Sequence, residues 1–218
     1  PSTLSWSSSK RNDFETCKRL YFLKRFWGQD EKLKWKLYEM SCISTLAMLR
    51  GIVVHEVIAD ALKSARDGHV IDVDTAKKAV TSVIREKYAQ SAKRMWHLDN
   101  RPRGSKIRDF TNLLEHYYNH PDVNDRAREA QINAWNCVTN LIGSEFWKAL
   151  TATDPDRWIE IDEEAFHSFD LDGIQVYCRI DAAHSSGEPT IIDWKTGAPG
   201  PNDRKQLAVY ALYGESKW

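Results

Sequence analysis

The sequence has no uninterrupted apolar run of the roughly 18 residues that a membrane-spanning helix needs. Its opening, "PSTLSWSSSKRNDF", also lacks the basic and then apolar order of a secretory signal. We therefore expect an intracellular, cytoplasmic protein without a membrane partner. A chain of 218 residues with 42% hydrophobic content is typical of one domain with its own core, so we expect residues 1–218 to form a single domain.

Paired cysteines are also missing. Four cysteines are scattered along the chain and none lies in a C-x-x-C pair: Cys17, Cys42, Cys137 and Cys178. This spacing gives no sign of a zinc site or a disulfide framework. In an intracellular protein such cysteines are most simply reduced thiols.

The sequence has no net charge, because 31 basic residues balance 31 acidic ones. The basic residues are nevertheless clustered, over 10–36 among aromatic residues and over 101–108. Clusters of this kind can attract DNA, since the local field steers a polyanion. The alternative is that they are solvated helix faces. A phosphate-binding G-x-x-x-x-G-K-[ST] loop is absent, so any DNA unwinding would need a partner such as a helicase.

Residues 1–150 are predicted to be mainly helical, from apolar residues at helical spacing and from capping residues. The expected helices are 7–27, 44–68, 72–96, 106–120 and 122–150. Gly51 within the second predicts close packing or a break. After Pro155 the short alternating segments of 157–197 predict a three-stranded meander, and 202–218 predicts a final helix. We therefore expect a helical portion at 1–150 and a sheet with the catalytic core at 151–218.

The segment "TIIDWKTG" (190–197) puts two charged residues after two isoleucines. Side chains alternate along a strand, so Asp193 and Lys195 share one face. A turn over 185–189 would pair this strand with "IQVYCRIDAAH" (174–184), with His184 opposite Thr190 and Asp181 opposite Asp193. Opposed side chains have Cβ atoms about 4.5–5.5 Å apart, so the two carboxylates need a proton or a cation between them. We favour a divalent metal ion. A salt-bridged strand end at the surface is the alternative.

Three other features favour a functional site. Thr196-Gly197 ends the strand abruptly, and Gln206 and Tyr210 are four residues apart on one face of the final helix. His55 lies in a strongly apolar helix, where an imidazole needs a partner.

The residues singled out above lie in four motifs, which follow one another along the chain: "GIVVHEVIADAL", "IQVYCRIDAAH", "TIIDWKTG" and "QLAVY". Their order and spacing resemble the RecB-like branch of the PD-(D/E)XK nucleases. The opening "SWSSSKRNDFETCKRLYFLKRF" is similar to the N-terminal segment of that family. The resemblance implies an α/β (α+β) fold with a restriction-endonuclease-like core, in which a small central mixed sheet is flanked by helices, here with a large helical N-terminal part.

The resemblance also implies the site. His55, Asp181, Asp193 and the backbone carbonyl of Trp194 would bind Mg²⁺ or Mn²⁺. Lys195 would be the catalytic lysine beside Asp193. Gln206 and Tyr210 would hold the site together or bind a substrate phosphate.

The chain departs from the family pattern in several places. Cys178 or Arg179 replaces a usual glycine, and Lys18 replaces a common proline. Cys17 matches the first cysteine of an iron–sulfur subset, but the other three cysteines do not match that subset, so we expect a structural thiol and no cluster. Relatives usually continue into another strand, and the sequence leaves open whether the chain is a fragment truncated at its C-terminus.

Metal-bound water and a positioned lysine suit phosphodiester hydrolysis. We therefore expect a metal-dependent DNA nuclease, an exonuclease acting on single-stranded or duplex ends in repair, recombination or defence, and giving 5′-phosphate products. Its partners would be DNA and a helicase or other nuclease-complex subunit. RNA as substrate and a catalytically inactive DNA-binding or protein-interaction module remain the alternatives.

Overall fold

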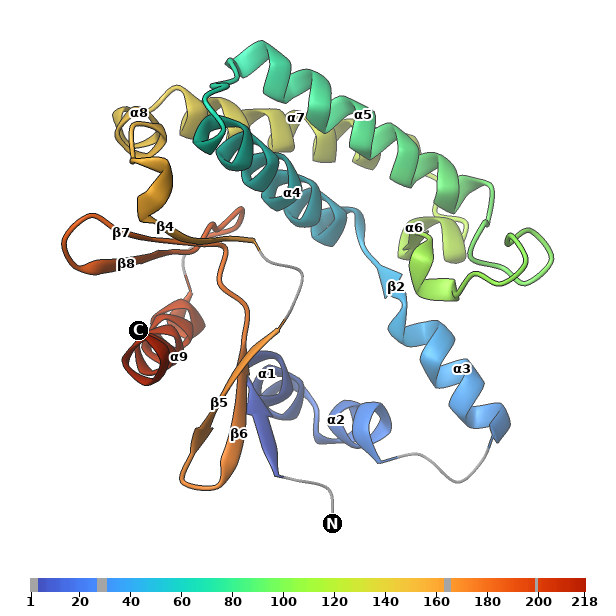
Figure 1. The fold of residues 1–218 in the computed structure, drawn as a ribbon. Coiled ribbons are helices and arrows are strands. Elements are labelled where there is room, and N and C mark those ends of the chain that lie inside the picture. Colours follow the sequence, from blue (N-terminus) through green and yellow to red (C-terminus); the bar gives the residue numbers. More distant parts are fainter. Residues whose placement is uncertain (1–3, 27–30, 163–165, 199) are drawn as a thin grey trace. The chain divides into compact units, whose positions relative to one another are not determined.

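A computed structural model describes residues 4–26, 31–162, 166–198 and 200–218 (Figure 1). The chain divides into two compact units. One, which we call the helical unit, comprises residues 28–151; the other, the sheet unit, comprises residues 1–27 and 152–218. The first strand and the first two helices therefore belong with the C-terminal third of the chain. The prediction of a single domain with its helical portion at 1–150 stays a prediction.

The helical unit is built on three long helices that pack on one another: α4 (Leu46–Arg66), α5 (Val73–Ala92) and α7 (Val123–Ile142) (Figure 1). Apolar residues at helical spacing form its core, where Val53, Val80 and Val138 have no exposed surface. The remaining elements are α3 (Glu31–Ser41), β2 (Ile43–Ser44), the 3₁₀ turn η1 (Ile107–Asp109), β3 (Asn112–Leu113), α6 (Leu114–Tyr117) and α8 (Glu145–Thr151).

Two predicted helices of this unit are confirmed at nearly the expected bounds. α4 runs without a break through Gly51 and is followed by Gly68, whose φ of +88° suits glycine. α5 begins at the predicted cap, because the Asp72 carboxylate accepts the Thr75 amide at 2.7 Å. Helix 122–150 is confirmed as two helices separated at Gly143 and Ser144.

The helix predicted over 106–120 is wrong for most of its length. The amide of Leu113 donates to the Ser91 hydroxyl at 2.9 Å, and the amide of Thr111 donates to the Gln90 side chain at 3.1 Å. Residues 112–113 also pair in parallel with β2. Side chains of α5 and a neighbouring strand thus take the hydrogen bonds that a local helix would have used, and helix remains over 114–117 alone.

α4 begins on two side-chain acceptors. The Thr45 hydroxyl accepts the Met48 amide at 3.1 Å, and the buried Glu115 carboxylate accepts the Leu46 amide at 3.1 and 3.3 Å. A negative charge here also stabilises the positive end of the helix dipole. Among the described residues, no helix is long and apolar enough to cross a membrane.

The sheet unit contains two three-stranded sheets. In the first, β6 (Ile174–Cys178) lies between β1 (Ser5–Ser7), which runs parallel to it, and β5 (His167–Leu171), which runs antiparallel. In the second, β7 (Ala182–Ser185) lies between β4 (Trp158–Ile161) and β8 (Pro189–Ile192), both antiparallel. The helices of this unit are α1 (Ser8–Thr16), α2 (Lys18–Arg25) and α9 (Pro201–Lys217), with a 3₁₀ turn η2 (Pro155–Arg157).

The predicted meander therefore differs from the observed strands. Its hairpin at "LDG" is confirmed, with Asp172 and Gly173 both at positive φ between Leu171 and Ile174. The segment 174–184, expected as one strand, is two strands in different sheets, joined by residues 179–181. The predicted mixed α/β class, with small sheets and flanking helices, is confirmed.

The predicted helix over 7–27 is interrupted at Cys17, whose backbone is extended (φ −160°, ψ 111°) and whose sulfur accepts the Leu20 amide at 3.4 Å. Its last residue, Trp27, lies outside the described residues. The final helix is confirmed as α9. It packs on β5, β6 and β8, and places Tyr210 and Tyr213 in a core with Phe169, Val176 and Ile180.

Candidate active site

The β7–β8 hairpin has the predicted register. His184 lies opposite Thr190, and the ladder continues through Ala183 and Ile191 to Ala182 and Ile192. The connecting loop is three residues, 186–188, because Ser185 and Pro189 also pair. Extending this register by one position places Asp181 across from Asp193. Both aspartates therefore lie at one end of the hairpin, directly after the last paired residues.

The Asp181 side chain closes this end of the hairpin. Its carboxylate accepts the backbone amide of Trp194 at 2.7 Å, across the strand pair. Its carbonyl accepts the amide of Asp162, which follows β4, at 2.8 Å. Asp181 is thus held from both neighbouring strands. Trp194 is 9% exposed and belongs to the core, as expected for a residue whose side chain points to the opposite face from Asp193 and Lys195.

Four of the predicted residues form one chain of contacts. The Lys195 ammonium is ion-paired with the Asp193 carboxylate and donates to the Gln206 amide oxygen at 3.1 Å. The Gln206 amide nitrogen donates to the Tyr210 hydroxyl, and that hydroxyl donates to Asp193 at 3.2 Å. The four side chains therefore close a ring. It forms because Gln206 and Tyr210 lie one helical turn apart and face the end of β8.

Burial sets the electrostatics of this ring. The Asp193 side chain is 8% exposed and that of Lys195 is 37% exposed, so the lysine is the member that reaches solvent. Burial, and then the neighbouring Asp193 charge, raise the pKa of the Tyr210 phenol. Tyr210 therefore keeps its proton at any physiological pH and acts as a permanent donor to Asp193.

His55 lies near the middle of α4, in the helical unit, and is half-buried. It follows the buried Val53 and Val54 on a helix whose apolar face forms the core of that unit. The sheet unit thus brings together Asp181, Asp193, Lys195, Gln206 and Tyr210. The assignments of His55 and of the Trp194 carbonyl as metal ligands stay predictions.

The residue types at the hairpin end fit a divalent cation. Two carboxylates and backbone carbonyls are the oxygen ligands that Mg²⁺ and Mn²⁺ prefer. Within the described parts of the chain, no group of three or more His, Cys, Asp or Glu side chains is gathered closely enough to hold a metal. In this arrangement one oxygen of Asp193 contacts the Lys195 ammonium and one oxygen of Asp181 accepts the Trp194 amide.

The structure also shows a pocket that the sequence predictions missed. A cavity of about 480 Å³ lies beside Gln206 and Tyr210. Lys10 of α1 and Arg25 of α2 line it, together with Arg179 from the link between the two sheets. The basic cluster beginning at Lys10 was visible in the sequence. Its position next to α9 was not, because it depends on the parallel pairing of β1 with β6.

The comparisons with known proteins agree with this geometry. The family model of the PD-(D/E)XK nuclease superfamily matches residues 5–217, from β1 to the end of α9. Neither the curated proteins nor the solved structures contain a significant match to this chain. Nucleases of this superfamily generally use divalent metal ions such as Mg²⁺ or Mn²⁺, and the observed mixed α/β fold is consistent with their restriction-endonuclease-like core. The match spans nearly the whole sequence, and the chain therefore belongs to the PD-(D/E)XK nuclease superfamily.

Proposed function

We propose that this protein is a metal-dependent DNA nuclease of the RecB-like branch, and that it acts as an exonuclease in DNA repair, recombination or defence. The observation that carries the proposal is the closed ring of Asp193, Lys195, Gln206 and Tyr210 beside Asp181. A salt-bridged strand end would not need the buried tyrosine and the glutamine that fix the lysine and the aspartate in place. An intracellular location and a helicase or nuclease-complex partner are part of the same proposal.

The metal would be held by Asp181 and Asp193, with the Trp194 carbonyl and His55 as the further ligands that the family resemblance implies. A Mg²⁺ or Mn²⁺ ion bound there lowers the pKa of a water molecule and polarises the scissile phosphate. Lys195 contacts one oxygen of Asp193, and the other carboxylate oxygens of Asp181 and Asp193 would be the ones available to such an ion. Gln206 keeps hold of the ammonium through its amide oxygen.

Lys195 then lies beside the reacting phosphate. Its ammonium orients the attacking water and offsets the negative charge that develops on the phosphoryl oxygens. The water oxygen forms a bond to phosphorus as the bond to the 3′ oxygen breaks, and a proton passes to that leaving oxygen. The products carry a 5′-phosphate and a 3′-hydroxyl. Tyr210 keeps its proton throughout and holds Asp193 in position.

The proposal is tested by cleavage of end-labelled single-stranded DNA, duplex DNA and RNA with Mg²⁺, with Mn²⁺ and with EDTA. We expect metal-dependent cleavage of DNA that falls by about 10²–10³-fold in Lys195→Ala, the typical cost of removing one transition-state donor. Asp193→Ala should lose at least as much. Lys148→Ala and Asp125→Ala are matched controls, because both side chains are highly exposed on the helical unit (67% and 78%), and they should keep full activity.

Equal cleavage by the wild type and by both site variants would show that the assigned residues do not catalyse the reaction. DNA binding without cleavage under every metal condition would instead support a catalytically inactive DNA-binding module. Calorimetric titration with Mn²⁺ separates these outcomes. Binding that is lost in Asp181→Asn and in Asp193→Asn locates the metal at the hairpin end, whereas binding that survives both changes places it elsewhere.

A further inference from the structure

The pocket beside Gln206 and Tyr210 is lined by cations and hydroxyl groups. Lys10, Arg25 and Arg179 contribute the charges, and consecutive serines at 7–9 contribute hydroxyl groups. None of the described residues that line the pocket is acidic. Its volume of about 480 Å³ is within the range of roughly 300–1,000 Å³ that is common for small-ligand sites. The chemistry of this wall therefore suits an anion.

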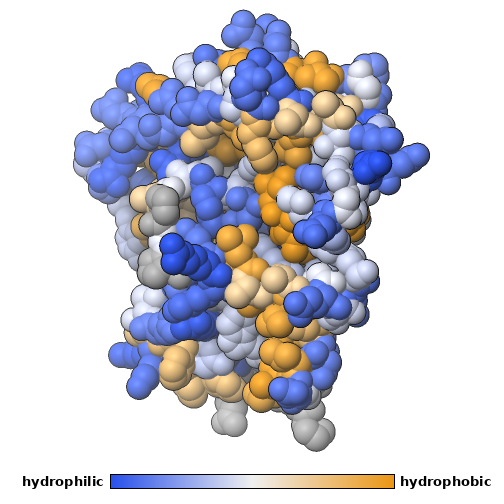
Figure 2. Space-filling model, turned by 90° about the vertical axis from the view of Figure 1, so that its left-hand side faces the viewer, coloured by the Kyte–Doolittle hydropathy of each residue, from blue (hydrophilic) through white to orange (hydrophobic). Residues whose placement is uncertain are grey.

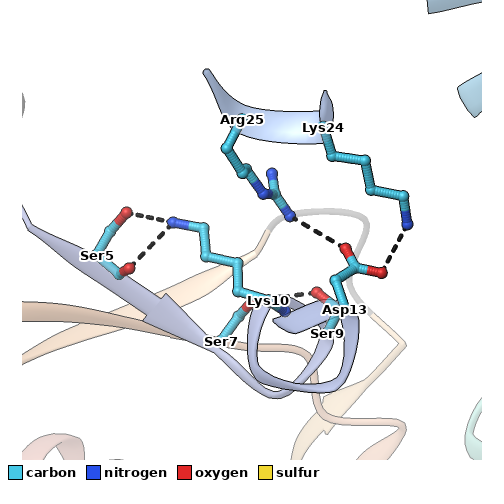
Figure 3. A network of polar contacts seen from close by, with 7 residues as sticks. All are labelled: Ser5, Ser7, Ser9, Lys10, Asp13, Lys24 and Arg25. Atoms are coloured by element: carbon cyan, nitrogen blue, oxygen red, sulfur yellow. Dashed lines mark hydrogen bonds and ion pairs between the residues drawn. The ribbon is translucent and has the colours of Figure 1, made fainter. Parts of the chain in front are cut away.

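The positive charge at this wall is only partly neutralised (Figure 3). Asp13 is the carboxylate drawn there, and it is shared between Lys24 at 2.7 Å and Arg25 at 3.9 Å. The Lys10 ammonium donates to the carbonyl and hydroxyl of Ser5, which carry no charge. Burial and then the nearby Arg25 charge lower the pKa of Lys10, as expected for a cation beside another cation. A bound anion would relieve this repulsion.

The positive charge of Arg179 is more fully neutralised than the charges of Lys10 and Arg25. Its guanidinium donates to the Asp162 carboxylate at 2.7 and 3.1 Å, and this ion pair fixes its orientation. Arg25 is better suited to bind a phosphate, because its contact with Asp13 is long and a guanidinium can donate two parallel hydrogen bonds. Lys10 and Arg25 are thus the two residues expected to carry phosphate binding.

Two aromatic side chains line the same pocket and are exposed to solvent. Phe166, which directly precedes β5, is 71% exposed, and Tyr177 of β6 is 38% exposed. Proteins that bind single-stranded nucleic acids combine a basic groove with exposed aromatic rings, because unpaired bases can stack on these rings. Bases within a duplex are already stacked on one another, so this combination favours a single strand.

We propose that this pocket is a subsite for one nucleotide of single-stranded DNA next to the phosphodiester bond that is cut. Lys10 and Arg25 bind the phosphate of that nucleotide, and Phe166 and Tyr177 stack on its base. Gln206 is shared between the subsite and the ring that holds Lys195, so a nucleotide seated here places the next phosphodiester at the hairpin end.

Because this inference rests on the proposed nuclease function, its test measures binding rather than cleavage. Fluorescence anisotropy of a labelled oligothymidylate of about ten nucleotides is followed in EDTA at several NaCl concentrations. Arg25→Gln and Lys10→Gln should each weaken binding by roughly tenfold at low salt, a charge-assisted hydrogen bond to phosphate being lost. Each should also reduce the slope of log K against log [NaCl] by about 0.7, the value for one phosphate contact on a single strand.

Matched controls lie on the helical unit. Arg128→Gln removes the same charge from a side chain that is 78% exposed on α7, and Phe146→Leu removes an aromatic ring that is 51% exposed on α8. Both should bind the oligonucleotide as the wild type does. Phe166→Leu should weaken binding by at least about fivefold, the lower limit for one stacked base. Circular dichroism spectra that match the wild type show that the variants are folded.

Unchanged affinity and salt slope in both Arg25→Gln and Lys10→Gln would overturn the subsite. The subsite would also be overturned if a duplex of equal length competed as well as the single strand and bound Phe166→Leu as tightly as the wild type. Cleavage that depends on Asp193 while the pocket variants bind normally would defeat the subsite alone. If the wild-type protein never cleaves DNA but the pocket variants still bind it more weakly, the nuclease function is refuted and the subsite is supported.

Discussion

Replacing Tyr210 by phenylalanine tests whether the ring of contacts positions the residues proposed to be catalytic. The change removes one hydroxyl from a side chain that is 2% exposed and leaves the aromatic ring to fill the core. The hydroxyl donates to Asp193 at 3.2 Å and accepts from Gln206. Asp193 would then keep Lys195 as its partner in the ring, and the Gln206 amide nitrogen would lose the Tyr210 hydroxyl as its acceptor.

The size of the effect follows from these bonds. Hydrogen bonds to charged groups contribute about 1.5–3 kcal/mol, and the long distance to Asp193 favours the lower end of that range. We expect Tyr210→Phe to lower the free energy of unfolding by about 1.5 kcal/mol. If the same bond holds Asp193 in the transition state, kcat falls about tenfold, because 1.36 kcal/mol corresponds to a factor of ten. The KM for DNA should change little.

Tyr213→Phe is the matched control. Tyr213 lies on the same helix, is 8% exposed, and its hydroxyl contacts His167 at 3.1 Å instead of Asp193. Urea unfolding should show a comparable loss of stability in both variants, whereas steady-state cleavage of labelled DNA should be slowed only in Tyr210→Phe. Equal kcat values for the two variants would refute the positioning role of Tyr210.

Three further predictions concern stability and reactivity. Glu115→Ala leaves the Leu46 amide at the start of α4 without its buried acceptor, so urea unfolding should show a loss of about 1–3 kcal/mol; an unchanged midpoint would contradict this role. The raised pKa of Tyr210 means that the native state holds this proton more tightly than the unfolded state. Its contribution is therefore complete below about pH 10 and is lost as the pH rises further, so the stability of the wild type should fall more steeply above pH 10 than that of Tyr210→Phe. Burial raises the pKa of Cys178 to about 11, so at pH 8 a thiol reagent should modify the exposed Cys17 much faster; equal rates would show that Cys178 is accessible.

Much of the site could be predicted because its determinants are local. The register that opposes Asp181 to Asp193 follows from a short hairpin loop, and a one-residue slip would have exposed Ile192. Gln206 and Tyr210 share a face through helical periodicity alone. These features depend on residues that are close in sequence, where pattern and structure are tightly linked.

The features that were missed depend on distant partners. Ser7 caps α1, but Ser5–Ser7 also forms an edge strand because β6 lies beside it. The segment 174–184 changes sheets at Arg179 because β5 pairs with its first half and β4 with its second. The helix predicted over 106–120 is replaced by hydrogen bonds that the Leu113 and Thr111 amides donate to the side chains of Ser91 and Gln90 on another helix. No local pattern encodes such partners.

The pairing of β1 with β6 also has a consequence for synthesis of the protein. Trp6 pairs with Val176, which leaves the ribosome about 170 residues later. At a translation rate of roughly 5–20 residues per second, β6 is synthesised on the order of 10–30 s after β1. The helical unit, made of residues 28–151, is complete in the meantime and can fold first. A nascent chain that stalls before β6 therefore carries the helical unit and an N-terminal strand without its neighbour, and the ring of Asp193, Lys195, Gln206 and Tyr210 forms only after α9 has been released.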